Sequence, residues 1–238
     1  MAERAQASVN TSAPTCLIIA DGSIATLVAV WREAVCRPGG GGANADSQSS
    51  RPVLWSPAGI SGTATAANNR IAQAAGLTSP IAGPLPAAIG GLAASLMLMA
   101  AGDEGARRGI GRVVWPVQLA ASDEQTRLTQ VGGVFDRALL VARLLSVDTR
   151  QSNGQSVLVH TPFAELSDTQ LLDLAADMDA PVGAAAWCDE QQPGQPACGT
   201  CAACVRWISA MKLAGIVAPI AQLPASLLED KPALEAVV

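Results

Sequence analysis

The stretch CLIIADGSIATLVAVWREAV, residues 16–35, contains the first strand-to-helix unit of the predicted fold. Residues 16–20 (CLIIA) form a short apolar run that predicts a buried strand, and apolar residues then recur at helical spacing over residues 24–35. Between them lies a tight turn, in which Ser23 is suited to cap the helix. The stretch therefore predicts a βα unit, the building block of parallel sheets.

The same alternation continues along most of the chain. We predict further strands at residues 52–55, 112–117 and 156–160. We predict further helices at residues 64–75, 86–108, 131–147 and 167–178, the last capped by Ser167. This order predicts an α/β fold in which a parallel sheet is covered by helices.

Composition limits the classes of partner and the compartment. The 238 residues are 50% hydrophobic, enough for one large domain, and the net charge of −5 without a dense basic cluster argues against nucleic-acid binding. The most apolar stretch, residues 87–101, is shorter than the roughly 20 residues of a bilayer-spanning helix, so we expect a buried helix and no membrane. The polar N-terminus lacks a secretory signal, so we expect a cytoplasmic protein.

Three segments are expected to lie outside the core. Residues 1–14 are polar and are predicted to be disordered, and residues 37–50, with four consecutive glycines, are predicted to be a flexible loop within the domain. Residues 218–238 are interpreted as a tail that forms a short helix or an arm onto a partner subunit.

Four of the six cysteines lie in WCDEQQPGQPACGTCAACVRW, residues 187–207. Cys188 is followed after nine residues by Cys198, and Cys201 and Cys204 come next at two-residue gaps, a spacing that suits one tetrahedral ion. Four thiolates leave no position for water, so we predict a structural Zn²⁺. Free thiols, two redox disulfides and an iron–sulfur cluster are the alternatives, although no proline follows the last cysteine as in ferredoxin motifs.

The other reactive side chains form no recognisable catalytic set. His160, the only histidine, ends a predicted strand at the expected cleft, where it is either a base near neutral pH or a hydrogen-bonded structural residue. Cys16 and Cys36 are interpreted as ordinary apolar positions. The scattered acidic residues are interpreted as a solvated face: Asp123, Glu124, Asp136 and Glu165.

A resemblance is carried by segments in the C-terminal third of the chain. In order along the chain they are VLVHTP (157–162), LSDTQLLDLAADMDAPV (166–182), AAWC (185–188), ACGTCAAC (197–204) and KLAGI (212–216). With these, residues 15–219 resemble the 7-cyano-7-deazaguanine synthases of the PP-loop ATP pyrophosphatase superfamily. The resemblance implies a Rossmann-like, PP-loop/HUP-type domain over residues 15–180, a zinc knuckle with a closing helix over residues 181–217, and a homodimer.

Members of that family use ATP to convert 7-carboxy-7-deazaguanine and ammonia to the nitrile, on the route to queuosine. Their S-G-G-x-D-S loop, which cradles pyrophosphate, corresponds here to residues 20–25 (ADGSIA), where only the second glycine remains. Asp21 puts a carboxylate where the polyphosphate would lie, and unit charges ~4 Å apart repel by roughly 4 kcal/mol at a dielectric near 20. The remaining candidates for nucleotide contact are Gly22, Ser23 and Thr26.

Two further positions depart from the family pattern. Asp168 stands where the family usually has a lysine, and Arg206 is displaced from the family arginine after the last cysteine. The D-x-x-x-Y-P-D-C-R signature is absent from the matching residues 122–137. We therefore expect a degenerate relative that acts in binding or assembly, with a small-molecule ligand at the strand ends. The alternative is an active ATP-dependent ligase with an altered loop.

Overall fold

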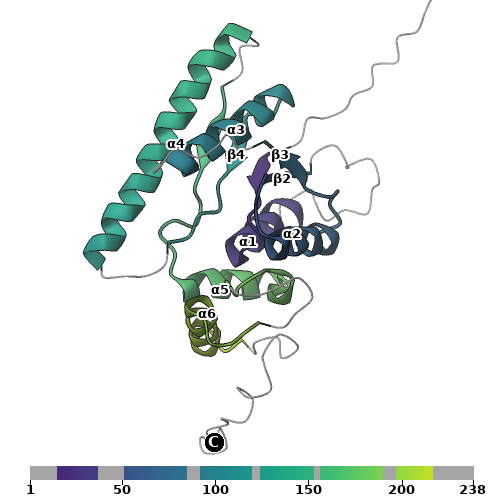
Figure 1. The fold of residues 1–238 in the computed structure, drawn as a ribbon, viewed down its shortest axis with the longest axis vertical. Helices are drawn as coiled ribbons and strands as arrows, with labels where there is room; N and C mark the ends of the chain where they lie inside the picture. The colour runs from purple at the N-terminus through teal and green to yellow at the C-terminus, as the bar shows by residue number, and fades with distance from the viewer. Residues whose placement is uncertain are drawn as a thin grey trace, which may run out of the picture.

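The computed structural model describes residues 15–36, 51–84, 92–119, 124–152, 156–189 and 197–216. Five parallel strands form one sheet in the order β3-β2-β1-β4-β5 (Figure 1). The strands are β1 (Leu17–Ile19), β2 (Val53–Pro57), β3 (Ile81–Gly83), β4 (Arg112–Val114) and β5 (Leu158–His160). The α-helices are α1 (Ile24–Ala34), α2 (Gly62–Ala74), α3 (Ala93–Arg107), α4 (Glu124–Ser152), α5 (Asp168–Asp177) and α6 (Ala202–Leu213), with a 3₁₀ turn at Val182–Ala184.

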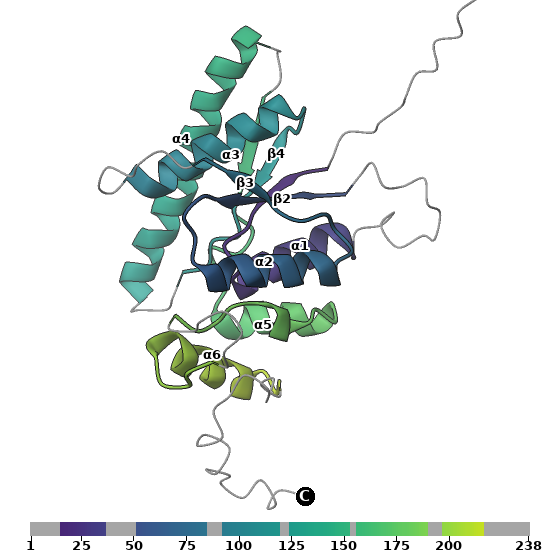
Figure 2. The ribbon, with the colours of Figure 1, turned by 45° about the vertical axis from the view of Figure 1, so that its right-hand side comes forward.

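Each face of the sheet is covered by its own group of helices. Because side chains alternate along a strand, Ile18 of β1 joins the core with α1, α5 and α6, whereas Leu17 and Ile19 join the core with α3 and α4. Figure 2 shows α1 and α2, then α5, then α6 below the sheet, with α3 and α4 on its other side. The predicted α/β class with a helix-covered parallel sheet is confirmed.

The lengths of several elements differ from the prediction. β4 ends at Val114, three residues early: Trp115 still donates its backbone N–H to the His160 carbonyl at 2.8 Å, but Pro116 has no N–H to continue the ladder. α4 is 29 residues long and extends well beyond the predicted residues 131–147, because its polar first turns and its glycine pair, Gly132 and Gly133, weaken the helical pattern. β3 was not predicted, since it has only three residues and a central exposed alanine.

Some predictions lie partly or wholly outside the described residues. They include the N-terminus 1–14, the loop 37–50, the tail 218–238 and the first residues of the helix predicted at 86–108. Among the helices that the structure describes, none is both long and apolar enough to cross a membrane.

Candidate metal centre and ligand cleft

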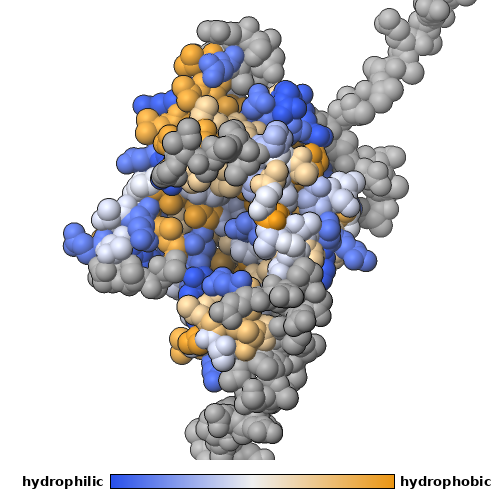
Figure 3. All heavy atoms as spheres, in the orientation of Figure 1, coloured by the Kyte–Doolittle hydropathy of each residue, from blue (hydrophilic) through white to orange (hydrophobic). Residues whose placement is uncertain are grey.

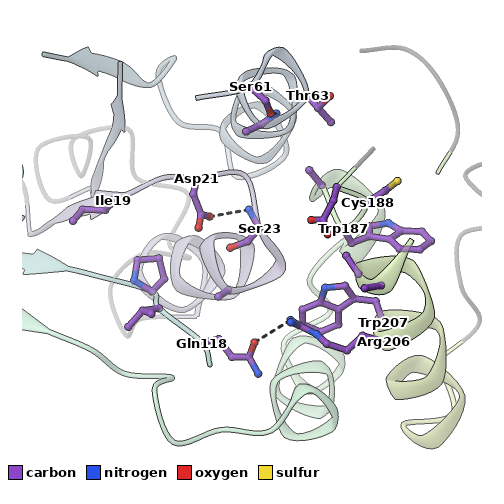
Figure 4. A pocket seen from close by; sticks show the side chains of 18 of the residues that line it. Ile19, Asp21, Ser23, Ser61, Thr63, Gln118, Trp187, Cys188, Arg206 and Trp207 are labelled. Carbon is purple, nitrogen blue, oxygen red and sulfur yellow. Dashed lines mark hydrogen bonds between the residues drawn. The ribbon is translucent and has the colours of Figure 1, made fainter. Parts of the chain in front are cut away.

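A cleft of about 660 Å³ opens at the carboxyl ends of β1 and β4, bounded by α1, α2 and the cysteine-rich segment before α6 (Figure 4). The strand order reverses between β1 and β4, and such a switch point is where parallel α/β sheets bind ligands. Its polar side chains are those of Asp21, Ser23, Ser61, Thr63, Gln118, Asp189 and Arg206. Its larger apolar side chains are those of Ile19, Met97, Trp115, Pro116, Val117, Trp187 and Trp207.

In the turn between β1 and α1, the carboxylate of Asp21 accepts hydrogen bonds from the residues that follow it. Asp21 Oδ1 accepts the backbone N–H of Ser23 at 2.9 Å and the hydroxyl of Thr26 at 2.7 Å. Ser23 caps α1 by accepting the backbone N–H of Thr26 at 3.2 Å. A helix N-terminus attracts an anion, and here Asp21 already supplies one.

Gly22 is fixed in this turn by its backbone. Its φ of +83° lies in the left-handed region, and a Cβ there would come within 2.8 Å of the Ala64 carbonyl oxygen of α2. The Gly22 carbonyl in turn accepts the backbone N–H of Ala186 at 2.7 Å, which ties the turn to the segment leading into the cysteine cluster. Of the three predicted nucleotide contacts, Ser23 lines the cleft, Gly22 shapes the turn, and Thr26 is buried against Asp21.

A buried polar network holds the end of β1. The Ala20 carbonyl accepts both the Ser56 hydroxyl at 3.1 Å and the Asn68 side-chain amide at 2.9 Å, and Asn68 also donates to Ser56 at 2.8 Å. Asn68 is 1% exposed, so these bonds fix α2 against β1 and β2 at the edge of the cleft. This network was not predicted from the sequence, although Asn68 is a polar residue on the buried side of a predicted helix.

Across the cleft from Asp21, Gln118 and Arg206 line the wall, and Asp168, which does not line the cleft, contacts both. Asp168 Oδ2 lies 2.8 Å from Arg206 Nε as an ion pair without hydrogen-bond alignment, and Asp168 Oδ1 accepts Gln118 Nε2 at 2.6 Å. Gln118 Oε1 accepts Arg206 Nη2 at 3.3 Å, and the guanidinium lies 4.7 Å from the centre of the Trp207 ring. Figure 4 shows Gln118, Arg206 and Trp207 together across the cleft from Asp21. The negative charge of Asp168 is therefore balanced by Arg206.

The four predicted metal cysteines converge at one point. Their sulfur atoms all lie within 4.8 Å of one another, and three Sγ–Sγ distances are 3.6, 3.8 and 3.9 Å. Four sulfurs around a Zn²⁺ with Zn–S bonds of about 2.3 Å are about 3.8 Å apart in a regular tetrahedron. The geometry therefore fits a tetrahedral metal ion, and the grouping of Cys188, Cys198, Cys201 and Cys204 can hold one.

Local hydrogen bonds prepare these sulfurs to bind a cation. Backbone N–H groups point at three of them, from Cys198 to Cys188 Sγ at 3.4 Å, from Cys201 to Cys198 Sγ at 3.3 Å, and from Cys204 to Cys201 Sγ at 3.4 Å. The N–H groups of Cys201 and Thr200 lower the pKa of the Cys198 thiol to about 6, whereas burial raises the pKa of the Cys204 thiol. Four thiolates this close need a cation between them.

The remaining predicted residues lie apart from the cleft. His160 ends β5 as predicted, but its side chain is exposed and does not line the cleft, so the structure gives it no place beside a ligand there. Cys16 is fully buried as expected, whereas Cys36 is exposed, because it follows the end of α1 rather than continuing its apolar face. Asp136 and Glu165 are solvent-accessible, in agreement with a solvated face, while Asp123 and the side chain of Glu124 lie outside the described residues.

Comparison with known proteins finds relatives of the C-terminal part. Residues 135–215 match the family model described as queuosine biosynthesis protein QueC. A 65-residue segment is 37% identical to the 7-cyano-7-deazaguanine synthase of Acetivibrio thermocellus, covering 27% of this chain and 28% of that protein. The family-model match confirms the resemblance predicted from the sequence over residues 135–215. The family-model match includes the cysteine cluster, α5 and α6, but not the β1–α1 turn.

Proposed function

We propose that this protein is a zinc-binding relative of the 7-cyano-7-deazaguanine synthases that does not bind ATP in the manner of the family. It acts instead by binding a small molecule in the cleft or by assembling with a partner. The observation that carries the proposal is the carboxylate of Asp21 at the N-terminus of α1, hydrogen-bonded to Ser23 and Thr26.

Electrostatic repulsion opposes nucleotide binding at the β1–α1 turn. A polyphosphate at the end of β1 needs the free backbone N–H groups and positive end of a helix, but the Ser23 N–H already donates to Asp21. An incoming phosphate would also approach a fixed negative charge. Because Arg206 is paired with Asp168, it does not offset that charge. A ligand without a polyphosphate fits the cleft better, between the carboxylates of Asp21 and Asp189 and the tryptophan walls.

The proposal assigns the metal a structural role. Cys188, Cys198, Cys201 and Cys204 would hold Zn²⁺, whose chemistry at a site of four thiolates is to crosslink the chain. Cys201 caps α6 and Cys188 lines the cleft, so the ion would hold the closing helix against the ligand cavity. The cysteines are free thiols, in keeping with action in a reducing compartment such as the cytoplasm.

The active-ligase alternative is supported by the match to the synthase family through the cysteine cluster and α6. ATP–pyrophosphate exchange with 7-carboxy-7-deazaguanine as acceptor separates the two functions. We expect no exchange above background for the natural chain. Exchange that depends on the acceptor would overturn the proposal and establish ligase chemistry with an altered loop.

A matched variant tests whether the β1–α1 turn alone prevents ATP binding. Ala20→Ser, Asp21→Gly, Ile24→Asp and Ala25→Ser together restore the family loop. We expect the variant to bind ATP, as measured by calorimetry, because it frees the Ser23 N–H and removes the carboxylate of residue 21. Ile24→Asp places the new carboxylate at a fully buried position of α1, so circular dichroism first checks that the variant folds. If the folded variant binds no ATP, the turn alone does not prevent ATP binding, and other residues of the cleft must also differ from those of the family.

A further inference from the structure

The cleft beside the β1–α1 turn combines aromatic walls with exposed acidic residues. Three of the five tryptophans of the chain line it: Trp115, Trp187 and Trp207. Asp21 and Asp189 line it as well, and both residues are exposed. Hydrophilic and apolar residues meet around the hollow above α6 in Figure 3. A pocket with these two kinds of wall suits a ligand that carries both an apolar body and a positive charge.

Negative charge outweighs positive charge among the side chains of the cleft. Arg206 is the one basic residue among the described residues that line it, and its charge is balanced by the ion pair with Asp168. With Zn²⁺ bound as proposed, four thiolates and one ion carry two net negative charges, and Cys188 brings this charge to the cleft wall. The carboxylates of Asp21 and Asp189 are then left without a compensating side chain on the cleft surface.

Three helices begin at the cleft, and the positive ends of their dipoles oppose this negative charge. The residues that line the cleft at the starts of α1, α2 and α6 are Ser23, Ala25, Ser61, Thr63, Ala202 and Ala203. A helix N-terminus carries about half a positive charge. Asp21 offsets this charge at α1, and the sulfur of Cys201, which caps α6, offsets it there. The half charge of α2 remains, and it is smaller than the full charge of Asp189.

We propose that the cleft binds an organic cation, in which an ammonium group is joined to an aromatic or other apolar body. This inference rests on the proposed function, because polyphosphate at the same turn would require the opposite charge. Asp21 uses Oδ1 for both hydrogen bonds of its turn, so Oδ2 is left to pair with the ammonium group. Trp115 and Trp187 would contact the apolar body. The cleft already holds one such pair, since the guanidinium of Arg206 lies 4.7 Å from the centre of the Trp207 ring.

Tryptophan fluorescence of the zinc-loaded full chain tests the proposal with three probes of similar shape. Phenethylammonium, phenethyl alcohol and phenylacetate share a phenyl body and differ in charge. We expect phenethylammonium to bind about fivefold more tightly than the alcohol, and phenylacetate to bind more weakly than either, because unit charges about 4 Å apart in water change an affinity by about fivefold. Added salt should weaken the binding of phenethylammonium and leave that of the alcohol unchanged.

Neutralising one carboxylate at a time tests where the cation binds. Asp21→Asn and Asp189→Asn should each weaken the binding of phenethylammonium by about fivefold, because each removes one charge while the side chain keeps its size. Neither should change the affinity for phenethyl alcohol. Asp173→Asn, which changes an exposed acid of α5 outside the cleft, is the matched control and should change neither affinity. Circular dichroism of each variant checks that the chain is folded.

The possible failures of this proposal differ from those of the proposed function. Absence of phenethylammonium binding, equal affinities for the three probes, a preference for phenylacetate, or an unchanged affinity in either cleft variant would overturn the organic-cation site. Saturable binding of magnesium ATP to the same sample would overturn the proposed function, whatever the three probes do. A sample that binds neither ATP nor phenethylammonium would overturn the organic-cation site alone.

Discussion

Replacing Asp21 with alanine should both destabilise the protein and open an anion site. The carboxylate of Asp21 accepts two hydrogen bonds, from the Ser23 N–H and the Thr26 hydroxyl, and lies at the positive end of α1. Hydrogen bonds to a charged acceptor contribute about 1.5–3 kcal/mol each when buried, and Asp21 is exposed, so we expect a total loss near 1–2 kcal/mol. For a chain of this size that corresponds to a fall in Tm of about 3–6 °C.

The same substitution should create affinity for pyrophosphate. Removing one unit charge about 4 Å from a bound phosphate relieves roughly 1 kcal/mol at the dielectric of water and about 4 kcal/mol at a dielectric near 20. The affinity of Asp21→Ala for pyrophosphate should therefore exceed that of the natural chain by about fivefold to a thousandfold. The anion would take the place of the lost carboxylate and restore part of the lost stability.

Thermal unfolding with and without pyrophosphate measures both effects. We expect Asp21→Ala to melt lower in plain buffer and to gain Tm as pyrophosphate is added, while the natural chain gains little. Asp21→Asn is the control that separates charge from geometry: it keeps the acceptor oxygen, so it should lose less stability than alanine. Equal stabilisation of the natural chain and Asp21→Ala by pyrophosphate would refute the claim that Asp21 excludes anions.

Three other variants test the β1–α1 turn, an ion pair at the opposite edge of the sheet, and the cysteine cluster. Gly22→Ala should lower the free energy of unfolding by about 2–4 kcal/mol, because φ is +83° and the Cβ would meet the Ala64 carbonyl. A variant as stable as the natural chain would show that the turn does not require glycine at this position. Glu33→Ala should lower the free energy of unfolding by about 2–4 kcal/mol, because it leaves the guanidinium of Arg112 without its carboxylate partner. Glu33 raises the pKa of Arg112 through their hydrogen bonds. In a double-mutant cycle, adding Arg112→Ala should recover part of the lost stability. Cys201→Ser should lower the zinc content from about one ion per chain. It should also let a protease cut first within residues 187–215. An unchanged zinc content would show that Cys201 is not a metal ligand.

The fold could be predicted from the sequence wherever apolar periodicity was strong. The run before Asp21 and the helix after it, with Ser23 as its cap, appear in the structure almost as predicted, and Ser167 forms a full capping box with Gln170. The short strand β3 and the full length of α4 could not be predicted in this way. β3 owes its place to pairing with β2, and α4 crosses two glycines because one of its faces packs against α3 and β5.

The cysteine cluster was more predictable than the cleft. Cysteine spacing alone brings four ligands to one point, since three of them lie within a single loop and the helix turn that follows it. The cleft instead depends on residues far apart in the sequence. Gln118 follows β4, Asp168 begins α5 and Arg206 lies on α6, so they meet only in the folded chain. Asp21 was correctly singled out as a charge at the strand end. That it accepts hydrogen bonds from its own turn became visible only in the structure.

We propose that the β1–α1 turn, in which Asp21 accepts the hydrogen bonds, does not bind ATP. Isothermal titration calorimetry of magnesium ATP into the zinc-loaded chain tests it most directly, beside the variant in which residues 20, 21, 24 and 25 carry the family loop. We expect no measurable heat of binding for the natural chain and clear saturation for the variant. Micromolar affinity of the natural chain for ATP would contradict the account.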